Sequence, residues 1–135
     1  MCNYADNKIR SRSKLLIIDD DETTRILIKD VLEDTGIPIL ESGCGMQAYG
    51  ILRNNRDEIG LILLDIRLPD YDGWLLITGI RRLAPEIPVI AISAIFPHEL
   101  AAKYKSAGFT EYMAKPFDTQ QLEAIVISYL QTETP

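Results

Sequence analysis

Short apolar runs alternate with amphipathic stretches along this chain of 135 residues. The apolar runs predict five strands, at residues 15–18, 37–40, 61–64, 89–93 and 109–114. Aliphatic runs without polar alternation, such as the one that ends at Asp65, indicate strands buried on both faces of a sheet. The second run contains Pro38. Because proline lacks the N–H that a central strand donates, this strand is expected at an edge.

The stretches between the strands have helical periodicity. They predict helices at residues 22–34, 46–53, 74–83 and 98–107, and a last helix that starts at Asp118. Gly36 suits the end of the first helix, and Asp118 with Gln121 suits a capping box at the last. Five strand–helix units with short connections imply right-handed crossovers. The sequence therefore predicts an α/β fold, a parallel sheet with helices on both faces.

Length and composition limit the function classes. The length suits one domain, expected at residues 14–131 between a flexible tail at 1–13 and a short tail at 132–135. The net charge of −6 argues against direct nucleic-acid binding, which needs a basic face. The chain has no apolar run long enough for a membrane span and no signal-peptide core. Cys2 and Cys44 have no motif spacing, so free thiols and a cytoplasmic location are expected.

Polar side chains stand at the carboxyl ends of the predicted strands. They are, in chain order, Asp19, Asp20, Asp65, Ser93 and Lys115. In a parallel sheet these ends share one edge, which is where open α/β sheets place their ligands. We therefore expect the five side chains to converge.

Three carboxylates at one edge need a counter-charge. At about 4 Å and an effective dielectric near 20, each pair of like charges costs on the order of 4 kcal/mol. Oxygen ligands without histidine or cysteine favour a hard ion, Mg²⁺ or Mn²⁺. Lys115 and Ser93 beside such an ion suit the oxygens of a phosphoryl group, and a carboxylate can attack phosphorus. The chemistry predicts an acyl phosphate on Asp65.

Four motifs together resemble the receiver domains of two-component response regulators. They are IIDDD at residues 17–21, LDIRLP at 64–69 with DG at 72–73, ISA at 92–94 and YMAKPF at 112–117. The resemblance covers about residues 14–130. It implies a flavodoxin-like sheet with strand order 2-1-3-4-5.

The resemblance also assigns the acceptor and the metal ligands. Asp65 would take a phosphoryl group from the phosphohistidine of a histidine kinase. Asp20, Asp65 and the backbone carbonyl of Arg67 would bind Mg²⁺ directly, and Asp19 would act through water. The chain is thus expected to be a phosphoacceptor regulatory domain that catalyses only its own phosphorylation and slow dephosphorylation.

The remaining roles implied by the resemblance concern signalling. Ser93 and Lys115 would contact the phosphoryl oxygens, and Ser93 and Tyr112 would switch the face made by the fourth helix, fifth strand and last helix. Expected partners are a sensor histidine kinase or phosphotransfer protein and an unknown downstream protein, with a possible phosphorylation-dependent dimer. A stand-alone regulator and a receiver from a hybrid kinase both stay open.

Three other functions compete with this interpretation. A haloacid-dehalogenase-like phosphatase needs a second acid two residues after its nucleophile, where this chain has Arg67. A flavodoxin-like FMN carrier needs a phosphate loop after the first strand, where this chain has three aspartates. A receiver fold used only for protein contacts would have no need of the complete set of acids, hydroxyl and lysine.

Overall fold

Five parallel strands form one sheet in the order β2-β1-β3-β4-β5. A computed structural model describes residues 12–94 and 101–130. The strands are β1 (Lys14–Ile18), β2 (Ile39–Ser42), β3 (Ile59–Asp65), β4 (Val89–Ser93) and β5 (Glu111–Ala114). The predicted fold class and strand order are confirmed, and β2 lies at an edge as Pro38 indicated.

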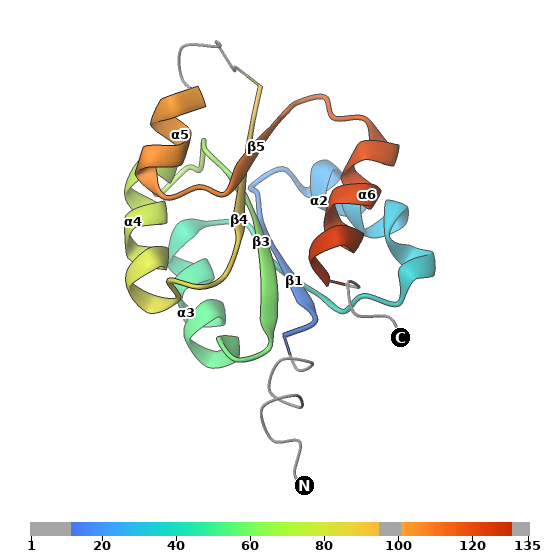
Figure 1. The fold of residues 1–135 in the computed structure, drawn as a ribbon, viewed down its shortest axis with the longest axis horizontal. Coiled ribbons are helices and arrows are strands. Elements are labelled where there is room, and N and C mark those ends of the chain that lie inside the picture. Colours follow the sequence, from blue (N-terminus) through green and yellow to red (C-terminus); the bar gives the residue numbers. More distant parts are fainter. Residues whose placement is uncertain (1–11, 95–100, 131–135) are drawn as a thin grey trace, which may run out of the picture.

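Five α-helices among the described residues cover the two faces of the sheet. They are α2 (Glu22–Val31), α3 (Gly45–Asn55), α4 (Gly73–Leu83), α5 (Ala101–Ala107) and α6 (Thr119–Leu130). Helices α3, α4 and α5 lie on one face and α2 and α6 on the other (Figure 1). Within the described ranges, no helix is both long and apolar enough to cross a membrane.

Alternate residues of each central strand enter two separate cores. In β1, Leu16 and Ile18 pack toward α3 and α4, whereas Leu15 and Ile17 pack toward α2 and α6. All four are almost completely buried. A strand covered on both faces has no solvent side. This is why its sequence is a continuous apolar run rather than an alternating one.

Several element boundaries differ from the sequence-based expectation. Strand β2 starts two residues later than predicted, directly after Pro38, whose carbonyl accepts a hydrogen bond from Leu15 N at 2.9 Å. Helix α2 ends three residues early, and a 3₁₀ turn (Glu33–Thr35) leads to Gly36, which has the left-handed φ of 75°. Strand β5 starts at Glu111, two residues late. Residues 98–100 of the fourth predicted helix lie outside the described residues.

The predicted tails fall largely outside the described ranges. Residues 1–11 and 131–135 are not among the described residues. Arg12, within the predicted N-terminal tail, forms an ion pair with Glu86 at 2.6 Å. The tail boundaries at residues 13 and 132 stay predictions.

Arg81 joins the carboxyl end of α4 to two loops. Its Nε donates to the Gly108 carbonyl at 2.8 Å and its Nη1 to the Ile87 carbonyl at 2.5 Å. Because Arg81→Met keeps the apolar stem but removes these donors, it should lower the free energy of unfolding by about 2–3 kcal/mol. Urea unfolding measures this, with Arg82→Met at an exposed neighbouring position as control. Equal losses in the two variants would contradict the assignment.

Candidate functional site

The carboxyl ends of four strands meet at one edge of the sheet. There the structure brings the carboxylates of Asp19, Asp20 and Asp65 together, with one oxygen of each lying within 4.8 Å of the others. Asp19 and Asp65 are buried, whereas Asp20 is exposed to solvent. Parallel pairing of β1 with β3 sets this arrangement, because Ile18 lies opposite Leu64 and the next residues are the acids.

Lys115 reaches this acidic cluster from the end of β5. Its Nζ lies 2.9 Å from Asp19 Oδ2 and 3.1 Å from Asp65 Oδ2. The backbone N–H of Lys115 donates to the Ser93 carbonyl at 2.8 Å, which extends the β4–β5 pairing to this position. Ser93 itself is buried, at the end of β4. The ammonium group therefore lies between two acids that are distant in sequence.

Burial and hydrogen bonding or ion pairing have opposite effects on the pKa values of the groups in this cluster. Burial raises the pKa of the Asp19 carboxyl, while hydrogen bonds from the Asp21 N–H and from Lys115 oppose the rise. For Lys115, burial disfavours the ammonium, but the hydrogen bond and charge of Asp19, together with Asp65, outweigh it and raise the pKa of the lysine. Lys115 is thus held in its charged form beside the acids.

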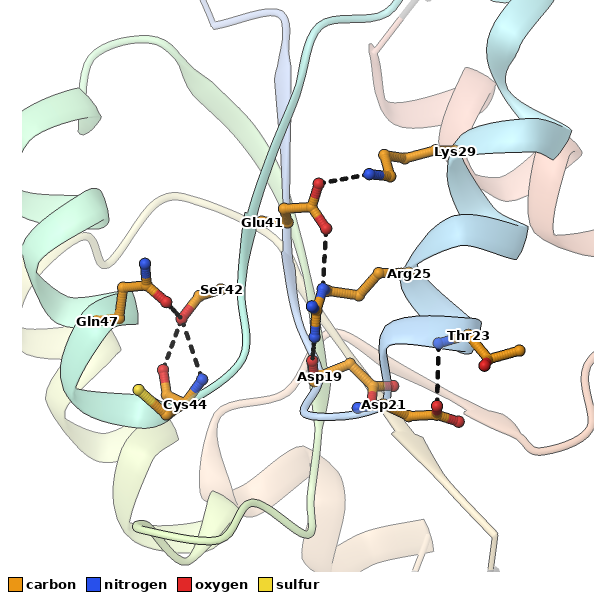
Figure 2. Close-up of polar contacts among 9 residues, drawn as sticks. All are labelled: Asp19, Asp21, Thr23, Arg25, Lys29, Glu41, Ser42, Cys44 and Gln47. Carbon is orange, nitrogen blue, oxygen red and sulfur yellow. Dashed lines mark hydrogen bonds and ion pairs between the residues drawn. The ribbon is translucent and has the colours of Figure 1, made fainter.

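The loop between β1 and α2 is fixed by Arg25. Its Nη1 donates to the backbone carbonyl of Asp19 at 2.5 Å and its Nε bonds Glu41 at 2.8 Å (Figure 2). On the other side, Asp21 N donates to Asp19 Oδ1, and the Asp21 side chain caps α2 through Thr23 N. Asp21 is therefore the N-cap of α2. Asp19 is held through both its backbone and its side chain.

The loop between β3 and α4 folds back over Asp65. Arg67 N donates to Asp65 Oδ1 at 2.9 Å, and Gly73 N donates to the Ile66 carbonyl at 3.0 Å. The Asp72 side chain caps α4 through Trp74 N. These contacts fix the backbone around Arg67; the role of its carbonyl as a metal ligand stays a prediction.

Asp70 ties the same loop to helix α3, a contact that sequence reasoning missed. Its two carboxylate oxygens accept from the N–H groups of Gly45 and Met46, at 2.8 and 3.1 Å. Cys44 stands at the N-cap of α3 and its side chain makes no cap hydrogen bond there. A helix start without a good capping residue was the available signal, but it could not identify a partner 25 residues away.

The hydrogen bonds to Asp70 lower the pKa of its carboxyl. A depressed pKa in the folded state contributes stability that is present above the ordinary aspartate pKa and is lost as the pH falls through the lower, folded value. Asp70→Asn should therefore be less stable than wild type near about pH 6, and the difference should shrink below about pH 3.9. Urea midpoints measured across this range test it, with Asp34→Asn as an exposed control. A pH-independent difference would contradict the prediction.

The predicted switch residue Tyr112 lies at the surface of β5, 42% exposed. Its ring stacks on that of Tyr104 from α5, with the centroids 5.3 Å apart. Tyr104 is buried; burial raises the pKa of its hydroxyl, and a hydrogen bond with the Ser93 side chain opposes this. Sequence reasoning gave Tyr104 no role. With Phe109, the two tyrosines line a groove of about 450 Å³ between α5 and β5.

The donor set of the acidic cluster fits a hard divalent cation. The described candidate ligands are carboxylate oxygens, two buried and one exposed. One lysine pairs with two of the three carboxylates, so the cluster keeps excess negative charge. Oxygen ligands and net negative charge are what Mg²⁺ and Mn²⁺ require.

Comparisons with known proteins agree with this geometry. The family model of the response regulator receiver domain matches residues 15–127. Sporulation initiation phosphotransferase F of Bacillus subtilis (strain 168) is 31% identical over 117 residues, which cover 87% of this chain and 93% of that protein. The sensor histidine kinase CheAY of Helicobacter pylori is 29% identical, over 88% of this chain but only 15% of the kinase.

A solved structure extends the similarity to three dimensions. A two-component response regulator from Clostridium difficile superposes with a TM-score of 0.80 and 31% identity, covering 88% of this chain and 96% of that one. Fold, strand order and family model coincide over nearly all described residues. The chain therefore belongs to the response regulator receiver domain family.

Proposed function

We propose that this receiver domain accepts a phosphoryl group on Asp65, in a Mg²⁺-dependent transfer from the phosphohistidine of a sensor histidine kinase or phosphotransfer protein. The contact of Lys115 Nζ with both Asp19 and Asp65 carries this proposal. It puts a cation beside the acceptor, while the neighbouring Asp20 supplies a further carboxylate. Membership of the family supports the same role.

The chain offers a set of oxygen ligands for the ion. Asp20, Asp65 and the backbone carbonyl of Arg67 would hold Mg²⁺ (or Mn²⁺), and Asp19 would act through a water molecule. When bound, the ion would neutralise negative charge on the carboxylates and the incoming phosphoryl oxygens. Arg25 and the Asp21 N–H keep Asp19 in place for this task.

Transfer would proceed as an in-line displacement at phosphorus. An oxygen of Asp65 forms the new P–O bond while the P–N bond to the donor imidazole breaks, and the bonding pair leaves with the imidazole nitrogen. Lys115 and the Ser93 hydroxyl bind the phosphoryl oxygens as charge develops on them. The protein acts here by positioning and charge compensation, which is most of what phosphoryl transfer needs.

The acyl phosphate would then change the surface that a downstream protein recognises. Ser93 and Tyr112 are the proposed switch residues, and α5, β5 and α6 form the responding face. The proposal includes a phosphorylation-dependent dimer that forms through this face. Residues 14–131 make up the proposed receiver unit, which acts as a regulatory phosphoacceptor.

The test uses Mg²⁺ and acetyl phosphate with the whole chain. Mass spectrometry should detect one added phosphoryl group in wild type and none in Asp65→Asn or without Mg²⁺. Asp30→Asn, at an exposed position on α2, is the matched control and should be modified normally. Unchanged modification of Asp65→Asn would exclude Asp65 as the acceptor.

A further inference from the structure

Tyr104 links the interior of the site to the outer surface of α5. Its exposed fraction is only 2%, although its neighbours Lys103 and Lys105 on the same helix are exposed. A buried tyrosine places its hydroxyl where a partner is available. The partner here is the side chain of Ser93, at the end of β4.

The ring of Tyr104 is packed against three other aromatic rings. It lies 4.8 Å from Trp74 and 5.8 Å from Phe109, centroid to centroid, and it stacks on Tyr112 at 5.3 Å with an interplanar angle of 22°. Tyr104, Phe109 and Tyr112 of this aromatic group line the groove between α5 and β5. Tyr104 thus contacts Ser93 through its hydroxyl and Tyr112 through its ring.

We infer that Tyr104 is a positioning residue that holds the Ser93 hydroxyl and couples its orientation to Tyr112 and the α5–β5 groove. This inference rests on the proposed phosphorylation of Asp65, because that event would give Ser93 a second partner. A serine hydroxyl has one donor hydrogen, so it cannot donate to Tyr104 and to a phosphoryl oxygen at the same time. When Ser93 turns to a phosphoryl oxygen, its bond with Tyr104 is altered.

Because Tyr104 is buried, a change in its hydrogen bond with Ser93 also affects how its side chain is packed. The Tyr104 hydroxyl is shielded from water, so losing its partner is unfavourable and the side chain must adjust. Its ring cannot move without disturbing the stacked Tyr112 and the adjacent Trp74. An inward turn of Tyr112 toward Ser93 would likewise require the Tyr104 hydroxyl to leave first. Tyr104 therefore controls the response of Tyr112.

Trp74, the one tryptophan of the chain, provides a reporter beside Tyr104. Adding Mg²⁺ and acetyl phosphate should change Trp74 emission in wild type. In Tyr104→Phe, mass spectrometry should find the same phosphorylation while the emission response is lost. Tyr112→Phe keeps the Tyr104–Ser93 contact and should retain the response. A full Trp74 response in phosphorylated Tyr104→Phe would overturn the coupling.

A second measurement does not depend on phosphorylation. Tyr104→Phe should lower the urea midpoint of wild type but should cost nothing further in the Ser93→Ala background, because the two hydroxyls act as one unit. Additive losses would overturn the inference. If wild type takes up no phosphoryl group, the proposed function fails, and the thermodynamic cycle still decides whether Tyr104 holds Ser93.

Discussion

Replacing Lys115 with methionine should slow phosphorylation of Asp65 by about 100-fold or more, the loss typical of removing one charge-stabilising donor from a transition state. The Lys115 ammonium lies 3.1 Å from Asp65 Oδ2 and 2.9 Å from Asp19 Oδ2. Among the described residues, it is the cation that pairs with both acids. Methionine keeps a stem of similar length without the charge. The rate is measured as mass gain over time with Mg²⁺ and acetyl phosphate.

The same variant should also be less stable when metal is absent. Removing Lys115 leaves two buried carboxylates near each other, and we expect a loss of about 2–3 kcal/mol at neutral pH, slightly below the usual cost of breaking a buried pair. The pKa of Asp19, already raised by burial, would rise further. An acid whose folded pKa is raised loses stability as the pH rises from the ordinary aspartate value, about 3.9, through the folded value, so the loss should be small in acid and complete above the folded pKa.

Mg²⁺ should restore part of the lost stability, since a divalent ion supplies the missing positive charge. Lys105→Met, on the exposed face of α5, is the matched control and should leave both rate and stability near wild type. If Lys115→Met were phosphorylated at the wild-type rate, the lysine would have only a structural role at the site.

Gly73→Ala should disturb both the fold and the site. A Cβ at this position would lie 2.6 Å from the Ile66 carbonyl oxygen and 2.7 Å from Ile66 Cα. Both are backbone atoms of the loop that follows Asp65, so relief requires the loop to move. We expect a loss of about 2–3 kcal/mol in unfolding free energy and about tenfold slower phosphorylation, because Arg67 lies in the same loop.

Gly50→Ala is a control in which the expected change in unfolding free energy has the opposite sign. Gly50 lies within α3, and a Cβ there would meet no atom within 4 Å. Alanine in a helix interior is favoured over glycine by about 0.5–1 kcal/mol, so this variant should be slightly more stable than wild type. Urea unfolding compares the two variants directly. A Gly73→Ala protein as stable as wild type would mean that the loop has room to shift.

Much of the fold was predictable because a buried strand can be recognised from its own consecutive residues. A strand covered on both faces needs consecutive apolar residues, and runs such as Leu61–Leu64 show this without knowledge of any partner. Parallel crossovers then place all carboxyl ends at one edge, which predicted that Asp65, Asp19 and Lys115 would meet there. The boundaries of the elements were less predictable. The start of β2 after Pro38, for example, depends on which of its backbone groups pair with β1.

The sequence by itself determined the α/β class, the edge position of β2 and the residue types gathered at the carboxyl edge, because periodicity and strand-end polarity are properties of neighbouring residues. Only the tertiary structure decided that Asp70 caps α3, that Arg25 holds the Asp19 carbonyl and that the Tyr104 hydroxyl bonds the Ser93 side chain. Each of these contacts joins elements whose distance and rotation are set by packing across the whole sheet. No local pattern of residues records such distances.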